Sequence, residues 1–145
     1  KKASVSSSNC ITVLACFCAP RHYKKDGRLV RLPPSLWLHL ENEMRPIAEG
    51  LPHSQQHMRM AARFPKDVED PIKREKLKPR ILHFCGHGDA GERFNKYGEV
   101  KPPGAEGIKG ALCWQGEDGA VALSSPDEIV KLLNGLPMTH THLEC

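Results

Sequence analysis

The chain has 145 residues, which suits one domain that is large enough to bury a core. Its 39% hydrophobic content is that of an ordinary globular protein, and no apolar run approaches the roughly 18 residues of a membrane span. The net charge of +4 is mild, and the basic residues clustered at 59–80 lack stacking aromatics, so they predict a solvated face. We therefore expect a cytoplasmic protein with no nucleic-acid and no membrane partner.

The first part of the chain predicts a leader, a strand and a loop. Residues 1–10 are basic and Ser-rich and predict a flexible leader; the lack of an initiator Met suggests a piece of a longer protein. Residues 11–18, ITVLACFC, are apolar and rich in β-branched side chains, as in a strand covered on both faces. Residues 21–35 predict a polar loop with a turn at Asp26-Gly27.

Residues 36–51 predict an amphipathic helix, because apolar side chains recur there at steps of three and four. These side chains are Leu36, Leu40, Met44, Ile47 and Leu51. Ser35 would cap this helix, and Pro46 should kink or divide it.

The rest of the chain alternates predicted strands and helices. In chain order we expect a strand at 57–64, a short polar helix at 67–78 interrupted by Pro71, a buried strand at 81–85, a long loop at 88–110, a hairpin with strands at 111–115 and 120–123, a helix capped by Ser124 or Ser125, and a strand beginning at 140. This order predicts an α/β domain with a mostly parallel sheet. Six cysteines without a secretory signal indicate free thiols in a reducing compartment.

The octet ILHFCGHG at 81–88 is the most informative stretch. It places His87 between two glycines where a buried strand stops, and the carboxyl ends of strands in open α/β sheets are where sites form. Histidine is also the side chain best suited to move protons near neutral pH. His87 is therefore either a catalytic residue or a turn histidine at a strand end.

Three kinds of chemistry fit this octet. Residues 86–91 match the pattern GxGxxG, but no helix is predicted after them to bind a pyrophosphate. His83, Cys85 and His87 could ligate a metal, but they lack the CxxC pairing of structural zinc sites. Further donors for such a site would be His140, His142 and Cys145. We favour neither alternative, and expect no cofactor and no metal.

The third possibility is a Cys–His nucleophilic site. An imidazole that withdraws the proton of a thiol makes that thiol a good nucleophile. The octet supplies His87, and the strand beginning at 140 would bring Cys145 to the same edge of the sheet.

Residues 11–145 resemble the CHAT domain, a caspase-like module named for its link to tetratricopeptide proteins. The matching segments are ITVLACFCAP (the opening strand), ENEMRPIAEGLPHS (the glutamate-bearing first helix, with Pro46 a departure), ILHFCGHG (the His motif, with Cys85 where Ser is usual), GALCWQGEDGAVALSSPDEIVKLL (strand, hairpin and helix) and HLEC (the start of the last diagnostic strand). The resemblance implies a caspase-like α/β sandwich with helices on both faces of a mostly parallel sheet, incomplete at its C-terminus.

The same resemblance implies a cysteine endopeptidase with a Cys–His dyad that acts on protein or peptide substrates and needs no cofactor. His87 would be the general acid and base, Gly88 would offer its backbone N–H to the oxyanion, and the loop 88–110 would border the substrate cleft. The nucleophile would lie about half a dozen residues beyond the end of the chain, with Cys145 itself as the rival assignment. The non-enzymatic alternative is a pseudo-protease or interaction module of a larger signalling protein, with tetratricopeptide-type partner domains.

Overall fold

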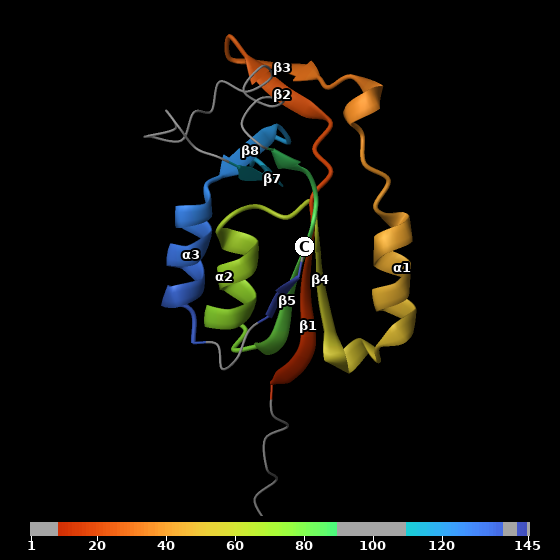
Figure 1. Cartoon of the computed structure of the whole chain (residues 1–145), viewed down its shortest axis with the longest axis vertical. Coiled ribbons are helices and arrows are strands. Elements are labelled where there is room, and N and C mark those ends of the chain that lie inside the picture. Colours follow the sequence, from red (N-terminus) through yellow and green to blue (C-terminus); the bar gives the residue numbers. More distant parts are fainter. Residues whose placement is uncertain (1–8, 90–109, 138–141, 145) are drawn as a thin grey trace, which may run out of the picture.

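A parallel β-sheet with the strand order β4-β1-β5-β9 forms the centre of the molecule (Figure 1). The computed structural model describes residues 9–89, 110–137 and 142–144. The sheet strands are β4 (Gln56–Met60), β1 (Cys10–Phe17), β5 (Lys78–Cys85) and β9 (His142–Glu144). Each neighbouring pair runs parallel, so the predicted α/β class with a parallel sheet is confirmed.

Helices cover both faces of this sheet. Helix α1 (Glu41–Gly50) lies on one side, and α2 (Lys66–Lys73) and α3 (Pro126–Gly135) lie on the other (Figure 1). Strand β1 is buried from both sides because successive side chains alternate between the faces. Val13, Ala15 and Phe17 pack toward α1, whereas Leu14 and Cys16 belong to the core beneath α2 and α3.

Helix α1 is shorter than the predicted helix at 36–51. A 3-10 turn, η1 (Pro34–Leu36), comes first, and the α-helix begins only at Glu41. Ser35 therefore lies inside the 3-10 turn, and the expectation that it caps the helix is wrong. The helix continues through Pro46. The carbonyl group that Pro46 cannot bond belongs to Asn42, and both residues are exposed.

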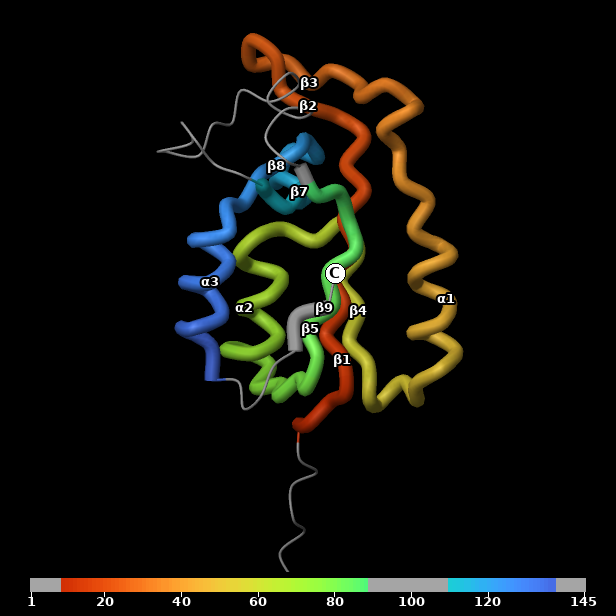
Figure 2. The backbone as a smooth tube through the Cα atoms, viewed as in Figure 1, coloured from red at the N-terminus to blue at the C-terminus, as the bar shows by residue number. Residues whose placement is uncertain are grey.

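The predicted polar loop at 21–35 contains a β-hairpin, which the sequence analysis missed. Strands β2 (His22–Lys25) and β3 (Arg28–Arg31) pair antiparallel around Asp26-Gly27. Both turn residues have positive φ, 50° and 72°, as a tight hairpin turn requires, so the predicted turn itself is confirmed. The hairpin lies beyond the carboxyl end of the sheet, near β7 and β8 (Figure 2).

The expected second hairpin is confirmed. Strands β7 (Ala111–Gln115) and β8 (Val121–Ser124) pair antiparallel, and the short strand β6 (Gly88–Asp89) joins them beside β7. The pair 88–89 was predicted to be loop, and β6 brings the chain directly from the octet into this small sheet.

The start of α3 shows which serine caps it. The Ser125 side chain accepts a hydrogen bond from the Glu128 backbone N–H, and the Glu128 carboxylate accepts one from the Ser125 N–H. This capping box satisfies two backbone donors at the helix start. Ser124 is fully buried instead, and its hydroxyl accepts a 2.7 Å hydrogen bond from the Trp114 indole N–H.

The segment between β1 and β5 differs from the prediction in detail. After a 3-10 turn, η2 (His53–Gln55), strand β4 ends at Met60, short of the predicted limit at 64. Helix α2 buries Val68, Pro71 and Ile72, and also Asp67, whose carboxylate accepts hydrogen bonds from the Arg63 backbone N–H and guanidinium. Pro71 lies inside the helix without interrupting it.

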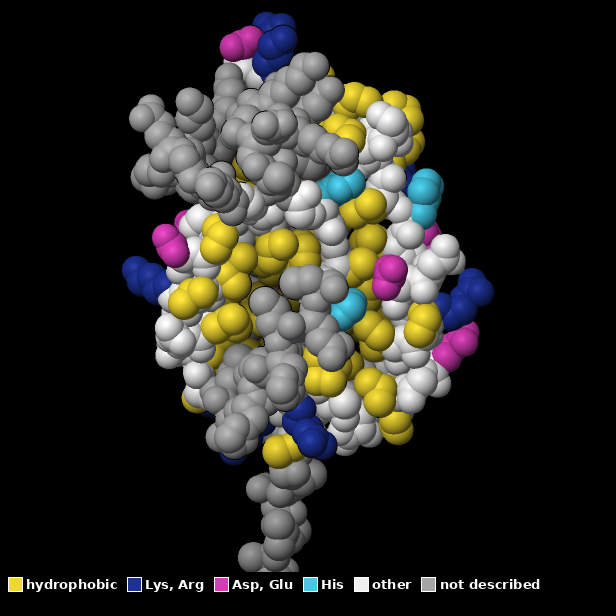
Figure 3. Space-filling model, in the orientation of Figure 1, with side chains coloured by type: hydrophobic (Ala, Val, Ile, Leu, Met, Phe, Trp, Pro, Cys, Tyr) yellow, Lys and Arg dark blue, Asp and Glu magenta, His cyan; other side chains and the backbone are white. Residues whose placement is uncertain are grey.

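The surface view shows hydrophobic side chains gathered in the strip between α1 and α3, on both sides of the atoms drawn in grey (Figure 3). None of the described helices combines the length and the apolar run needed to cross a bilayer.

Candidate active site

The octet lies where the sequence placed it, at the carboxyl end of the sheet strand β5, between β1 and β9. Gly86 follows the strand directly and is held close to β1. A Cβ atom there would lie 2.7 Å from Cζ of Phe84 and 3.1 Å from the carbonyl oxygen of Cys18. Glycine is therefore required at this position by a close approach, and the chain leaves the strand on one defined path.

His87 is half-buried at the end of this path, and its ring is held by the main chain. Its Nε2 lies 2.7 Å from the carbonyl oxygen of Leu36, which is 51 residues away in sequence. Because a carbonyl oxygen only accepts hydrogen bonds, Nε2 carries the proton, and Nδ1 holds the lone pair when the ring is neutral. The arrangement fixes both the orientation and the tautomer of the imidazole, as the carboxylate does in a Ser-His-Asp triad.

The Leu36 carbonyl is itself held in place. The Trp37 indole N–H donates a 2.9 Å hydrogen bond to the carbonyl of Leu32, a fully buried residue. Arg21 precedes β2, and Arg31 is the last residue of β3. Their guanidinium groups lie 4.9 and 4.4 Å from the centre of the Trp37 ring. The hairpin that sequence reasoning missed thus supports the group that orients His87.

Gly88 offers its backbone N–H on the side away from strand β7. The Cys113 N–H donates to the His87 carbonyl, so the next antiparallel pair, Gly88 and Leu112, is a non-hydrogen-bonded one. The Gly88 N–H is therefore directed away from β7, and a Cβ atom added there would meet no atom of the described residues within 4 Å. An apolar hollow of about 350 Å³ adjoins it, lined also by Ala111, Leu112 and Pro126.

Two further predictions about this site concern residues outside the described ranges. Cys145 and most of the loop 88–110 lie there, so the structure places neither the suggested nucleophile nor the cleft border. What the structure does describe is the backbone register of β9, in which His83 is paired with Glu144.

The described thiols nearest the octet are poor nucleophiles. Burial raises the pKa of Cys16 to about 12 and also raises the pKa of Cys18. Burial first, and then the negative charge of Glu43, raises the pKa of Cys85 above its ordinary value. No disulfide joins the described cysteines, as predicted, and these three carry protonated sulfur at neutral pH.

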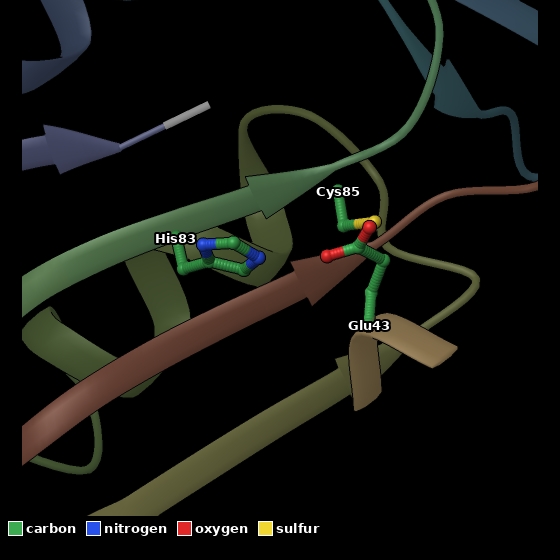
Figure 4. A group of neighbouring side chains, drawn as sticks. All are labelled: Glu43, His83 and Cys85. Atoms are coloured by element: carbon green, nitrogen blue, oxygen red, sulfur yellow. The ribbon is translucent and has the colours of Figure 1, made fainter. Parts of the chain in front are cut away.

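A second group of reactive side chains lies on the α1 face of the sheet. Glu43 of α1 meets His83 and Cys85 of β5, and the candidate ligand atoms of the three all lie within 4.8 Å of one another (Figure 4). Among the described residues this is the group that could hold a metal ion. His87 is not part of it, so the donor set His83, Cys85 and His87 considered from the sequence is not the one that the structure assembles.

Comparisons with protein-family models, with curated protein sequences and with solved structures gave no match.

Proposed function

We propose that this chain is the histidine-bearing part of a caspase-like cysteine endopeptidase, with His87 as its general acid and base. The observation that carries the proposal is the hydrogen bond from His87 Nε2 to the Leu36 carbonyl. It holds a titratable ring at the carboxyl end of a sheet strand and leaves Nδ1 as the basic nitrogen. A fixed ring orientation and tautomer is what proton transfer at one defined ring nitrogen requires.

The nucleophilic thiol would come from the strand beside β5. Cys85 is partly buried and points into the α1 face, and its pKa is raised, as are those of the buried Cys16 and Cys18. Strand β9 runs parallel to β5, so a continuation in the same register would bring a residue about four positions after Glu144 level with His87. We place the nucleophile there or shortly beyond, downstream of Cys145, with Cys145 as the rival assignment.

The proposed reaction is peptide hydrolysis through a thioester, and it uses only these groups and water. Nδ1 of His87 removes the thiol proton, and the thiolate attacks the peptide carbonyl carbon to form a tetrahedral intermediate. The Gly88 N–H, directed away from β7, donates to the oxyanion. The imidazolium then protonates the leaving amine as the C–N bond breaks, and a water molecule deprotonated by His87 hydrolyses the thioester.

The test uses the longer protein that the proposal requires, with whatever residues follow Cys145, and a mixture of peptides analysed by mass spectrometry. His87→Ala should lower cleavage about 10²–10⁴-fold or more, because it removes the proton-transfer group. His53→Ala is the matched control, since His53 is exposed in η2 and should leave cleavage unchanged. Undiminished cleavage by His87→Ala would contradict the proposal. A parent protein that carries no downstream cysteine and cleaves nothing would instead support the pseudo-protease or interaction module.

A further inference from the structure

Three potential metal ligands converge between α1 and β5, from parts of the chain far apart in sequence. His83 and Cys85 are two residues apart on β5, so their side chains project from the same face of the sheet. Helix α1 packs on that face and contributes Glu43, whose carboxylate lies beside both side chains (Figure 4). The candidate ligand atoms all lie within 4.8 Å of one another.

The imidazole of His83 indicates that a ligand binds between α1 and β5. Its Nε2 atom is buried and has no hydrogen-bond partner within the described parts of the chain. Figure 4 shows this outer end of the ring directed toward the Glu43 carboxylate. A buried polar atom without a partner loses its hydration without compensation, so native structures rarely keep one without a reason.

The donor set has a clear chemical preference. Thiolate, imidazole and carboxylate together are the ligands of zinc and similar divalent transition metals, whereas magnesium and calcium require oxygen. In a tetrahedral zinc site the ligand atoms lie about 3.2–3.8 Å apart, and rotation of the exposed Glu43 side chain can close the remaining gap. The exposure of Glu43 also leaves one side open for the ion to enter and for a water molecule to complete the coordination.

We propose that Glu43, His83 and Cys85 form a binding site for a divalent transition-metal ion, best matched by Zn²⁺. The site is separate from the proposed peptidase chemistry, because His87 bonds to Leu36 and contributes no ligand. The proposal also revises the expectation of no metal drawn from the sequence, in which Glu43 is one polar residue of a predicted helix.

The test is titration of the purified, metal-stripped full chain with Co²⁺ and then with Zn²⁺. Cobalt bound to a thiolate gives a charge-transfer absorption band in the near ultraviolet, which reports directly on a Co–S bond. We expect one equivalent of Co²⁺ to produce this band and Zn²⁺ to displace it. Zinc at about 100 times its Kd should raise the melting temperature by roughly 5–10 °C, since it binds only the folded chain.

Two pairs of variants test the ligands. Cys85→Ser should abolish the cobalt–thiolate band, whereas Cys10→Ser, at an exposed cysteine, should keep it. Glu43→Gln should weaken binding at least about tenfold, whereas Glu49→Gln, at another exposed position of the same helix, should not. Because Glu43 is exposed, its variant should fold even where Cys85→Ser does not. A wild-type chain with no band, a band lost in Cys10→Ser, or equal affinities for the two glutamate variants would overturn the proposal.

Discussion

Replacing Gly86 by Ala tests the path that carries the chain from β5 to His87. The added Cβ would lie 2.7 Å from Cζ of Phe84 and 3.1 Å from the Cys18 carbonyl oxygen. Phe84 cannot move aside easily, because it is buried with its ring 4.8 Å from that of Trp114, and the Cys18 carbonyl belongs to the backbone. Overpacking of this kind costs about 1–3 kcal/mol, which for a chain of this size lowers the melting temperature by roughly 3–10 °C.

Gly88→Ala is the matched control, since a Cβ atom there meets no atom within 4 Å in the described part of the chain. That variant should be neutral or slightly stabilising, because alanine has less conformational freedom than glycine in the unfolded chain. The assay is urea denaturation of both variants and the parent chain, followed by tryptophan fluorescence. Equal midpoints for the two alanine variants, at an unchanged slope, would refute the close approach at Gly86.

Two further predictions follow from local geometry. Ser125→Ala removes the cap of α3 and should lower the free energy of unfolding by about 1 kcal/mol, measured by denaturation; no change would contradict the capping box with Glu128. Because the pKa of Cys85 is raised, by burial and then by the charge of Glu43, its alkylation by iodoacetamide in the metal-stripped chain should be slow at neutral pH and accelerate as the pH rises. Glu43→Gln removes the negative charge, lowers that pKa and should speed alkylation of Cys85 at pH 8, measured by peptide mass spectrometry; a slower reaction would contradict the assigned cause.

Most elements could be predicted because their burial follows a simple pattern. Strand β1 is apolar throughout since helices cover both of its faces, and the start of α3 is marked by Ser125, Pro126 and Glu128. The hairpin β2-β3 could not be predicted in the same way. Its side chains are largely exposed, so no alternation marks its strands, and Asp26-Gly27 was the single visible signal.

The start of helix α1 was predicted too early for a different reason. The apolar spacing extends back to Leu36, but Pro34–Leu36 form a 3-10 turn, and Trp37 after it is extended and donates its indole N–H to the Leu32 carbonyl. The Trp37 ring also packs against the guanidinium groups of Arg21 and Arg31, and this packing overrides the local period, which apolar spacing alone does not encode.

The candidate site was predicted in part. The octet indicated His87, but the group that orients its ring is a main-chain carbonyl, which leaves no mark in the sequence because every residue has one. The role of Glu43 could not be predicted from the sequence either. Its meeting with His83 and Cys85 depends on how α1 packs on the sheet, a long-range fact that helical spacing does not encode.

The catalytic role proposed for His87 depends on the Leu36 carbonyl, which holds the ring with its proton on Nε2, so that Nδ1 is the base. Long-range ¹H–¹⁵N correlation spectra of the labelled chain, recorded at a pH where the ring is neutral, report the tautomer of each histidine. We predict that His87 is locked as the Nε2–H form, whereas the exposed His53 averages between tautomers. A His87 ring with its proton on Nδ1, or one that averages as His53 does, would contradict the account.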